Sequence, residues 1–470
     1  MSRESDNSKF SDAEADGRSL LLSGSIWSFF SLVIAGLLAL AIQSLLTRLL
    51  SPSDVGVLAL VQSMVFVTII VSDPGIVQYL PKLLGTLSAD KQTGQQNAVI
   101  RTSLLLAVLI YLVAGVLVGV AGLGHWVNLK VFPNINLDRW LIYTFPLIFL
   151  TGLLQHVSFI YRGLHKVGKS ILFGIQNNGV GYQVAFLIAL VIYWFADKFE
   201  LVIALNILIV ATALPLAWAL WGISEKIFDN RSGWYPVQEI LAHSYPIWGS
   251  TIGFMILMQA GVWIVGAFTG DKEVALYISA WRLSAFVYFP LIVINAVIPP
   301  IVARMYHQEQ KSELEILLRQ GATITGVASM LLGAVFILFA EPILSLLFGG
   351  YYGSAKWMLV ALSIGQIVNV AAGSGGIVLN MTGHQRTLAA LTLLNIVVVL
   401  AIGIGFAIPF GANGVAFAIA LALIIQNLLM VGMVKYRTGM RIYFAFEHLK
   451  LLQPVRLFGF AKQFLGPGAR

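Results

Sequence analysis

The chain has 470 residues, of which 58% are hydrophobic and only 11% are charged, against about 25% charged residues in an average soluble domain. Its mean hydropathy is +0.86. These values predict an integral membrane protein. The chain contains no cysteine, which excludes disulfides, thiolate metal sites and a cysteine nucleophile. The net charge of +8 arises mostly from loops on one side of the membrane and does not indicate a nucleic-acid partner.

The chain begins with a polar segment and continues with twelve apolar runs. Residues 1–24 hold five acids and three Lys or Arg and lack the pattern of a signal peptide, so they are predicted to form a disordered cytoplasmic tail. Each run is close to the roughly 20 residues that cross about 30 Å of hydrocarbon. All should be helices, because lipid offers no partner to an open backbone. The runs are 25–47, 55–72, 98–121, 140–161, 170–195, 201–223, 242–268, 274–301, 321–340, 357–379, 387–408 and 413–434.

The twelve runs form two sets of six that repeat each other weakly. SPSDVGVLAL (51–60) and GDKEVALYIS (270–279) both lie between the first and second run of a set, and the same offset of 219 residues places His165 on His384. Six spans return the chain to its starting side, so the repeat is parallel, with its axis along the membrane normal. The expected parts are the tail 1–24, an N-terminal six-helix bundle 25–223, a cytoplasmic linker 224–241, a C-terminal six-helix bundle 242–436 and a basic amphipathic cytoplasmic tail 437–470.

The positive charges of the loops predict the orientation. If the N-terminus is cytoplasmic, the inside segments hold 22 Lys and Arg and the outside segments hold 6. Both termini are therefore expected in the cytoplasm, and residues 122–139 outside. Seven of the inside charges lie in 435–470, where PVRLFGFAKQFL can form an amphipathic helix on anionic lipids of the inner leaflet. An unstructured basic tail is the alternative.

The loops offer no room for a catalytic domain, since the longest connections are about 25 residues. The chain is therefore predicted not to be an enzyme. GLHKVGKS (163–170) matches the phosphate-loop pattern, but that pattern binds nucleotide only between a strand and a helix. Here a membrane run precedes it, which favours a tight basic turn.

Two arginines lie inside the apolar runs. Arg101 is within a turn of a run's end, where it can snorkel. Arg282 lies about 12 Å deep at 1.5 Å per residue, where a charge costs at least ~2.5–3.5 kcal/mol. Arg282 is thus expected to face an anionic ligand in a wet cavity. The alternative is that it snorkels outward or pairs with Asp271 or Glu273.

Other polar residues recur in the runs. SDPG (72–75) predicts a helix restart with Asp73 as N-cap and Pro74 at the first helical position, and coupling to an ion is the alternative role of Asp73. Neutral amides can hold helices together or line a transport path. They are Gln43, Gln62, Asn177, Gln259, Asn295, Gln366 and Asn369.

Three stretches resemble the MOP (multidrug/oligosaccharidyl-lipid/polysaccharide) exporter superfamily. LLTRLLSPSDVGVLALVQS (45–63) and SDPGIVQYLP (72–81) resemble its polysaccharide-transport branch, the O-antigen and exopolysaccharide flippases. AWRLSAFVYFPLIVINAVIPPIVARM (280–305) resembles span eight of the lipid II flippases, where an arginine in this context lines the central cavity and is needed for transport. Arg282 stands at that position. The chain departs from the lipid II flippases by its uncharged first span and twelve rather than fourteen spans, and from multidrug exporters by the lack of an acid within runs one to six.

The resemblance implies an all-α fold of two six-helix bundles in a V. It also implies a multi-pass protein of the inner (cytoplasmic) membrane that flips a polyprenyl-diphosphate-linked oligosaccharide, functions as a monomer and has polysaccharide assembly proteins as candidate partners. No cofactor is expected beyond a coupling ion, H⁺ or Na⁺. Multidrug/cation antiport and, less favoured, a membrane glycan polymerase or ligase are the alternatives. The candidate substrate-binding residues are Arg282, Arg48, Gln43, Gln62, Gln259, Trp281 and Asn295, with Asp73 as the coupling-ion candidate.

Overall fold

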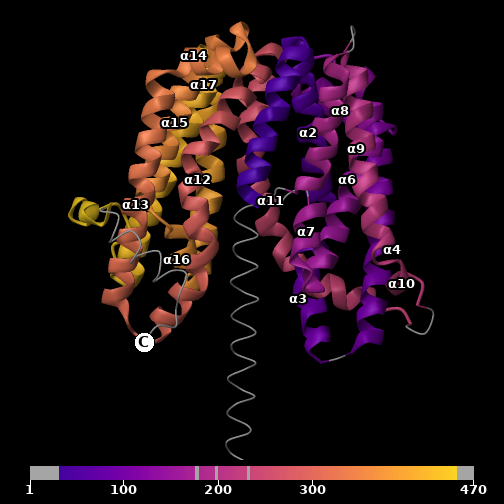
Figure 1. Ribbon diagram of the computed structural model, residues 1–470, viewed down its shortest axis with the longest axis horizontal. Coiled ribbons are helices and arrows are strands. Elements are labelled where there is room, and N and C mark those ends of the chain that lie inside the picture. The colour runs from indigo at the N-terminus through magenta and orange to yellow at the C-terminus, as the bar shows by residue number, and fades with distance from the viewer. Residues whose placement is uncertain (1–30, 91, 175–178, 196–198, 230–232, 453–470) are drawn as a thin grey trace, which may run out of the picture.

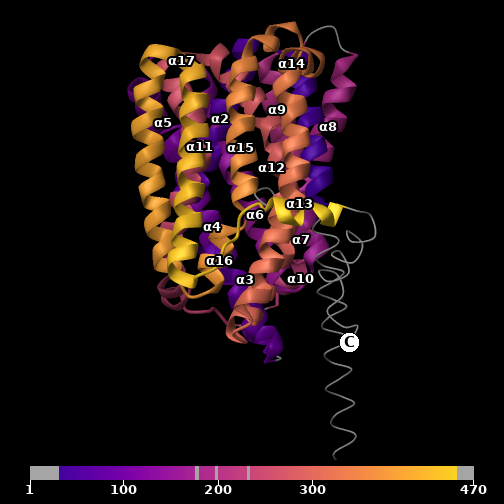
Figure 2. The ribbon, with the colours of Figure 1, turned by 90° about the vertical axis from the view of Figure 1, so that its left-hand side faces the viewer.

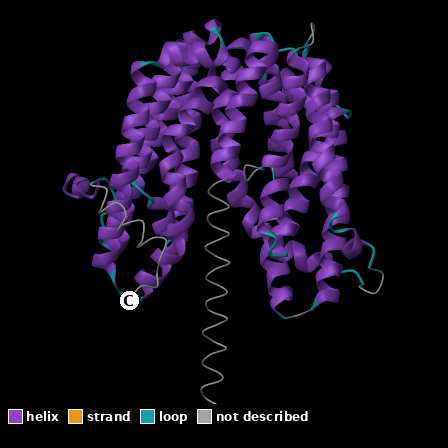
Figure 3. Ribbon diagram, viewed as in Figure 1, coloured by secondary structure: helices purple, strands orange, loops and turns teal. Residues whose placement is uncertain are grey.

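The computed structural model describes residues 31–90, 92–174, 179–195, 199–229 and 233–452. The predicted tail 1–24, the stretch 453–470 and Asn177 lie outside these residues. In the described part of the chain every regular element is a helix (Figure 3). Ten of these helices are long and apolar enough to cross a membrane, with mean hydropathies of 1.4 to 2.6.

The first half of the chain supplies the N-terminal bundle. Its fifth crossing is the short helix α8, which has 15 residues. The elements are the helix Ser31–Leu49, α2 (Pro52–Ser72), α3 (Ile76–Ala89), α4 (Thr93–Gly119), α5 (Leu123–Val131), α6 (Asp138–Gly163), α7 (Val167–Phe173), α8 (Val180–Trp194), α9 (Leu201–Trp221) and α10 (Ser224–Ile227).

The second half ends in α17 (Gln385–Thr438), which has 54 residues and contains two crossings. The helix breaks at Gly411, whose φ of 57° and ψ of −143° lie outside the helical region. The chain reverses there, and Asn395 on one arm donates a 2.9 Å hydrogen bond to Gln426 on the other. The other elements are α11 (Val237–Phe268), α12 (Asp271–His307), α13 (Lys311–Leu338), α14 (Ala340–Phe348), η1 (Gly350–Ala355), α15 (Lys356–Ala372), α16 (Gly375–Met381) and η2 (Phe446–Leu452).

The predicted twelve-span helical fold is confirmed, because α8 and the second arm of α17 complete the ten long helices. Two bundles meet near α14 and diverge toward the end that holds α3 and α16 (Figure 1). Figure 2 shows α14 at one end of the molecule and α16 and α3 toward the other. We call these the closed end and the open end. Helix α11 belongs to both bundles. Near the open end its His243 stacks on Tyr79 of α3 at 5.4 Å between ring centroids, and farther along it packs against α17.

The closed end is built where α2 and α12, the second helices of the two sets of six, lie against each other. Ser53 donates a 2.5 Å hydrogen bond to Asp271. A Cβ added to Gly56 would lie 1.8 Å from the carbonyl oxygen of Asp271. Only a residue without a side chain permits this approach. Nearby, Arg48 donates a 2.6 Å hydrogen bond to the carbonyl of Leu346.

Local motifs of the N-terminal bundle fold nearly as predicted. The chain breaks at SDPG, and the Asp73 carboxylate accepts a 2.7 Å hydrogen bond from the amide of Ile76. The N-cap residue is Gly75, however, and Pro74 precedes α3 rather than beginning it. The GLHKVGKS stretch is a tight turn between helices α6 and α7, with His165 at a φ of 58°. No strand adjoins it in the described residues, so it lacks the geometry of a phosphate loop.

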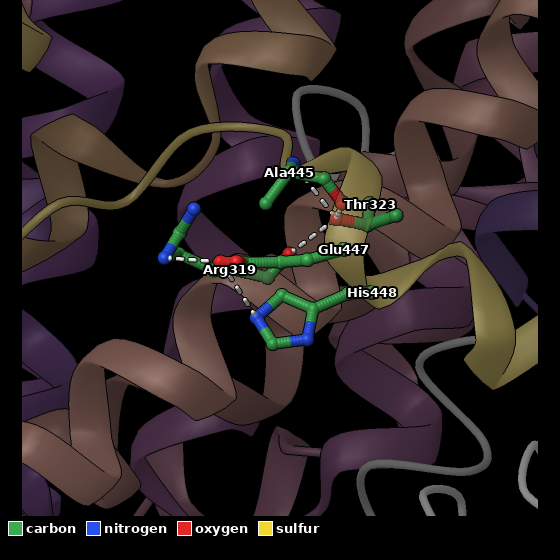
Figure 4. A network of polar contacts seen from close by, with 5 residues as sticks. All are labelled: Arg319, Thr323, Ala445, Glu447 and His448. Atoms are coloured by element: carbon green, nitrogen blue, oxygen red, sulfur yellow. Dashed lines mark hydrogen bonds and ion pairs between the residues drawn. The ribbon is translucent and has the colours of Figure 1, made fainter.

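After α17 the chain crosses the C-terminal bundle as a strap, residues 439–452. Ile442 is fully buried, and its carbonyl lies 2.4 Å from the place where a Cβ of Gly373 would stand, between α15 and α16. The strap is fixed on α13 by a 3.1 Å hydrogen bond from the Ala445 amide to Thr323 and by a 2.7 Å ion pair between Glu447 and Arg319 (Figure 4).

We predict that Gly56→Ala prevents full closure of the closed end. The added Cβ must move from 1.8 Å to the 3.4 Å of an ordinary van der Waals contact with Asp271. Spin labels on cysteines at Trp126 and Tyr351, one on each bundle, should therefore report longer distances by pulsed electron paramagnetic resonance than in the parent.

The matched control is Gly249→Ala on α11, where an added Cβ has no neighbour within 4 Å. This change should leave the distance distribution as it is. An unchanged distribution in Gly56→Ala would show that the closed end does not depend on this contact.

Candidate functional site

Arg282 lies in a pocket between the bundles. The pocket has a volume of about 100 Å³, and among the described residues that line it Arg282 is the only charged one and the only one from the second half of the chain. The helix Ser31–Leu49 and helices α2, α6, α8 and α9 form the rest of the wall. Its polar members are Gln62, Thr151, Tyr182, Gln183 and Thr212.

The Arg282 guanidinium has few partners of its own. Its Nη1 lies 3.5 Å from the carbonyl of Ala39, at the limit of a hydrogen bond. No carboxylate pairs with it in the part of the chain that the structure describes. The pairing with Asp271 or Glu273 that we considered is therefore not seen, and Asp271 instead accepts from Ser53. A partly buried guanidinium with five donors and one weak acceptor is suited to binding an anion.

A second cavity lies within the C-terminal bundle, among α11, α12, α15, α16 and α17. Its volume is about 530 Å³, and none of the residues that line it is Asp, Glu, Lys, Arg or His. Its lining is rich in aromatic rings and side-chain amides. The amides are Asn295, Gln366, Asn369, Asn380, Asn395, Gln426 and Asn427, and the aromatic residues are Phe254, Tyr277, Trp281 and Tyr288.

Helix α12 separates the two cavities. Arg282 lines the pocket of the N-terminal bundle, whereas its neighbour Trp281 lines the amide cavity. Successive residues of an α-helix point about 100° apart, which allows this division. Ser284 and Tyr288 continue the Trp281 side. The residue that carries the positive charge and a residue that lines the amide cavity are thus neighbours in the sequence.

The remaining predicted residues divide among several places. Gln62 joins Arg282 in the pocket, and Trp281 and Asn295 join the amide cavity. Three others make contacts between the bundles and line neither cavity: Gln43 donates to Ser279 at 3.2 Å, Gln259 accepts from Ser63 at 2.6 Å, and Arg48 donates to Leu346.

Asp73 is buried at the break between α2 and α3, with an exposed fraction of 7%. Tyr111 of α4 donates a 2.9 Å hydrogen bond to its carboxylate, in addition to the bond from Ile76. A small pocket beside it includes Gln155 of α6 and Thr251 of α11, so the pocket reaches the helix that both bundles share. Among the described residues no cluster of His, Asp and Glu could hold a metal ion.

Sequence reasoning missed four amides of the larger cavity. Asn380 lies in the last turn of α16, and Asn395, Gln426 and Asn427 lie on the two arms of α17. For the three on α17, the signal in the sequence was the occurrence of amides within the last two apolar runs. Their grouping with Asn295 and Gln366 follows only from the way α17 folds back beside α12 and α15.

Two diverging bundles of membrane-spanning helices, with a pocket between them and a cavity within one of them, define a multi-pass membrane transporter. The family model described as polysaccharide biosynthesis protein matches residues 21–306, and the MatE model matches residues 246–405. The first match covers more than half of the chain. The chain therefore belongs to the polysaccharide biosynthesis protein family, in the polysaccharide-transport branch of the MOP superfamily.

Known relatives agree with this assignment. A probable low-salt glycan biosynthesis flippase of Haloferax volcanii is 25% identical over 227 residues, which are 47% of each chain. This chain thus matches about half the length of that relative. Among solved structures, an inward-facing multidrug resistance MATE family transporter superimposes with a TM-score of 0.71 at 16% identity, over 86% of this chain and 94% of the other.

A second solved structure shows the same fold. A MOP superfamily transporter from Pyrococcus furiosus superimposes with a TM-score of 0.60 at 16% identity, over 90% of this chain and 96% of that one. Its description reports a binding pocket of reversed polarity. At this identity the likeness establishes the shared fold of two bundles and nothing about the substrate of this chain.

Proposed function

We propose that this transporter is a flippase, which moves a polyprenyl-diphosphate-linked oligosaccharide across the cytoplasmic membrane for polysaccharide biosynthesis. The bundles would rock about the contact between α2 and α12, so that the cavities face each side of the membrane in turn. The observation that carries the proposal is Arg282, a partly buried cation in the pocket between the bundles that no carboxylate pairs with in the described residues.

A lipid diphosphate is the anion that fits this position. A guanidinium can bind two phosphate oxygens at once through its planar fork, and it does not lose its proton. The pocket lies between bundles, so a polyprenyl chain can remain in the bilayer while the diphosphate enters. The flippase of Haloferax volcanii supports a glycan as cargo. A single chain supplies both cavities, from which we infer that the protein acts as a monomer, delivering substrate to polysaccharide assembly proteins.

Drug export coupled to a cation is the second candidate. The MatE match and the buried carboxylate of Asp73 favour it. Against it, neither of the two large cavities contains an acid to attract a cationic drug. In either case we propose that Asp73 binds the coupling ion, H⁺ or Na⁺, because it contacts both bundles through its pocket.

We predict that the open end faces the cytoplasm, as the excess of Lys and Arg in its loops requires. Single cysteines at Glu309, in an open-end loop, and at Tyr351, at the closed end, can be introduced into a chain without native cysteine. An impermeant maleimide should label Tyr351→Cys in intact cells and Glu309→Cys only after permeabilisation. The reverse pattern would invert the topology.

We predict that Arg282→Ala lowers translocation of a lipid-linked oligosaccharide by at least about tenfold, since a hydrogen bond to a charged group contributes ~1.5–3 kcal/mol. Arg282→Lys keeps the charge but loses the fork, so it should have a partial defect. The measurement is flipping of fluorescent lipid-linked oligosaccharide in proteoliposomes at matched protein content.

The exposed Arg139, which stacks on Trp140 with 4.3 Å between its guanidinium carbon and the ring centroid, provides the control. Arg139→Ala should flip lipid at the rate of the parent. Wild-type flipping by Arg282→Ala would show that the arginine has no role in holding the substrate.

We predict that Asp73→Asn uncouples flipping from an ion gradient. The side chain keeps an oxygen that can accept from the Ile76 amide, so the break between α2 and α3 is retained, but it can no longer carry a charge. Flipping should become insensitive to imposed H⁺ and Na⁺ gradients. If the variant still responds to a gradient as the parent does, Asp73 serves only to cap α3.

A further inference from the structure

The amides of the C-terminal cavity are held in fixed pairs. Asn369 donates a 3.0 Å hydrogen bond to Gln366, Ser374 donates a 2.6 Å bond to Asn295, and Asn395 donates a 2.9 Å bond to Gln426. These pairs come from different helices or different turns, so they set the amides in place before any ligand arrives. Preorganised polar groups reduce the entropic cost of binding.

Each pair leaves hydrogen-bonding capacity unused. A carboxamide has two donors and an acceptor oxygen with two lone pairs. Asn395 is only 7% exposed, and its Oδ1 is buried without a hydrogen-bond partner. A buried polar atom left unsatisfied costs about 1–3 kcal/mol. A ligand hydroxyl or amide that donates to this oxygen would remove that cost.

The absence of charge in the cavity lining restricts the ligand. Taking an ionised group out of water is costly unless an opposite charge receives it, and none of the lining residues provides one. The ligand is therefore rich in neutral donors and acceptors. Sugar hydroxyls, which both donate and accept, match amides in this respect.

The remaining wall suits a sugar ring. Trp281 and Tyr288, which face the cavity from α12, offer flat apolar surfaces to the carbon–hydrogen faces of a pyranose. The volume of about 530 Å³ falls in the usual range of roughly 300–1,000 Å³ for small-molecule sites. The cavity shares helix α12 with Arg282, which lines the pocket proposed for the diphosphate.

We infer that the C-terminal cavity binds the glycan portion of the substrate, and that this portion is electrically neutral in the sugars next to the diphosphate. The inference rests on the proposed function, in which Arg282 holds the diphosphate. The substrate thus straddles α12, with its anionic group on one face of the helix and its first sugars on the other.

The test compares three probes on the purified full-length protein in nanodiscs by calorimetry. They are farnesyl diphosphate, farnesyl diphosphate bearing a neutral disaccharide of N-acetylhexosamines, and the same glycolipid with a uronic acid in place of the second sugar. The parent should bind the neutral glycolipid at least about tenfold more tightly than the other two probes.

Two variants identify the sugar site. Asn395→Leu and Asn369→Leu should each bring the affinity for the neutral glycolipid down toward that for farnesyl diphosphate, and leave farnesyl diphosphate itself within about twofold. Asn369→Leu serves if Asn395→Leu does not fold. The control is Asn206→Leu on α9, an exposed amide that bonds only to its own helix at Val202, and it should bind all probes as the parent does.

The outcomes separate the two proposals. If the parent binds all three probes alike, or if the cavity variants leave the neutral glycolipid affinity unchanged, the sugar site is refuted while a diphosphate site stands. Equal binding of the uronic acid probe refutes neutrality. If Arg282→Ala leaves every affinity unchanged, or the parent binds no probe, the proposed flippase site is refuted.

Discussion

The structure depends on one constraint, the lack of water in the hydrocarbon core of a membrane. There an unpaired backbone group or an isolated charge has no solvent to stabilise it. Helices satisfy the backbone, and their apolar surfaces account for the composition. Any departure from this pattern must then be enclosed by protein. Arg282, Asp73 and the amides of the C-terminal bundle are the departures, and each lies in a cavity or a buried contact.

Helix α12 organises these exceptions. It meets α2 at the closed end, contributes Arg282 to the pocket of the N-terminal bundle, and lines the amide cavity with Trp281 and Tyr288. A rocking motion that separates the bundles must therefore move one of the two binding regions relative to the other. The proposed substrate has a charged group followed by a neutral group. Because it would contact both regions, its binding gives a physical reason for the motion.

Much of the fold could be predicted from the sequence, because hydropathy reports crossings directly. The twelve spans follow from the apolar runs, and the break at Asp73 follows from its proline and glycine. Arg282 stands out in the sequence as a charge deep in an apolar run, and no carboxylate pairs with it in the described residues. The sequence did not reveal that Arg48, Gln43 and Gln259 make contacts between bundles, since periodicity cannot distinguish such contacts from a cavity wall. The amide pairing of Asn395 with Gln426 depends on the reversal at Gly411, which joins residues far apart in the chain.

Helix α12 presents Arg282 to one cavity and Trp281 to the other, and this placement restricts insertions and deletions in the helix during evolution. Because Trp281 and Arg282 are consecutive, inserting or deleting one residue between Asp271 and Trp281 would turn the rest of the helix by about 100°. The guanidinium would leave its pocket, and other side chains would face the amide cavity. Single replacements in the lining of either cavity can therefore change the substrate preference. The length of the segment between Asp271 and Trp281 is expected to stay fixed in descendants that transport the same substrate.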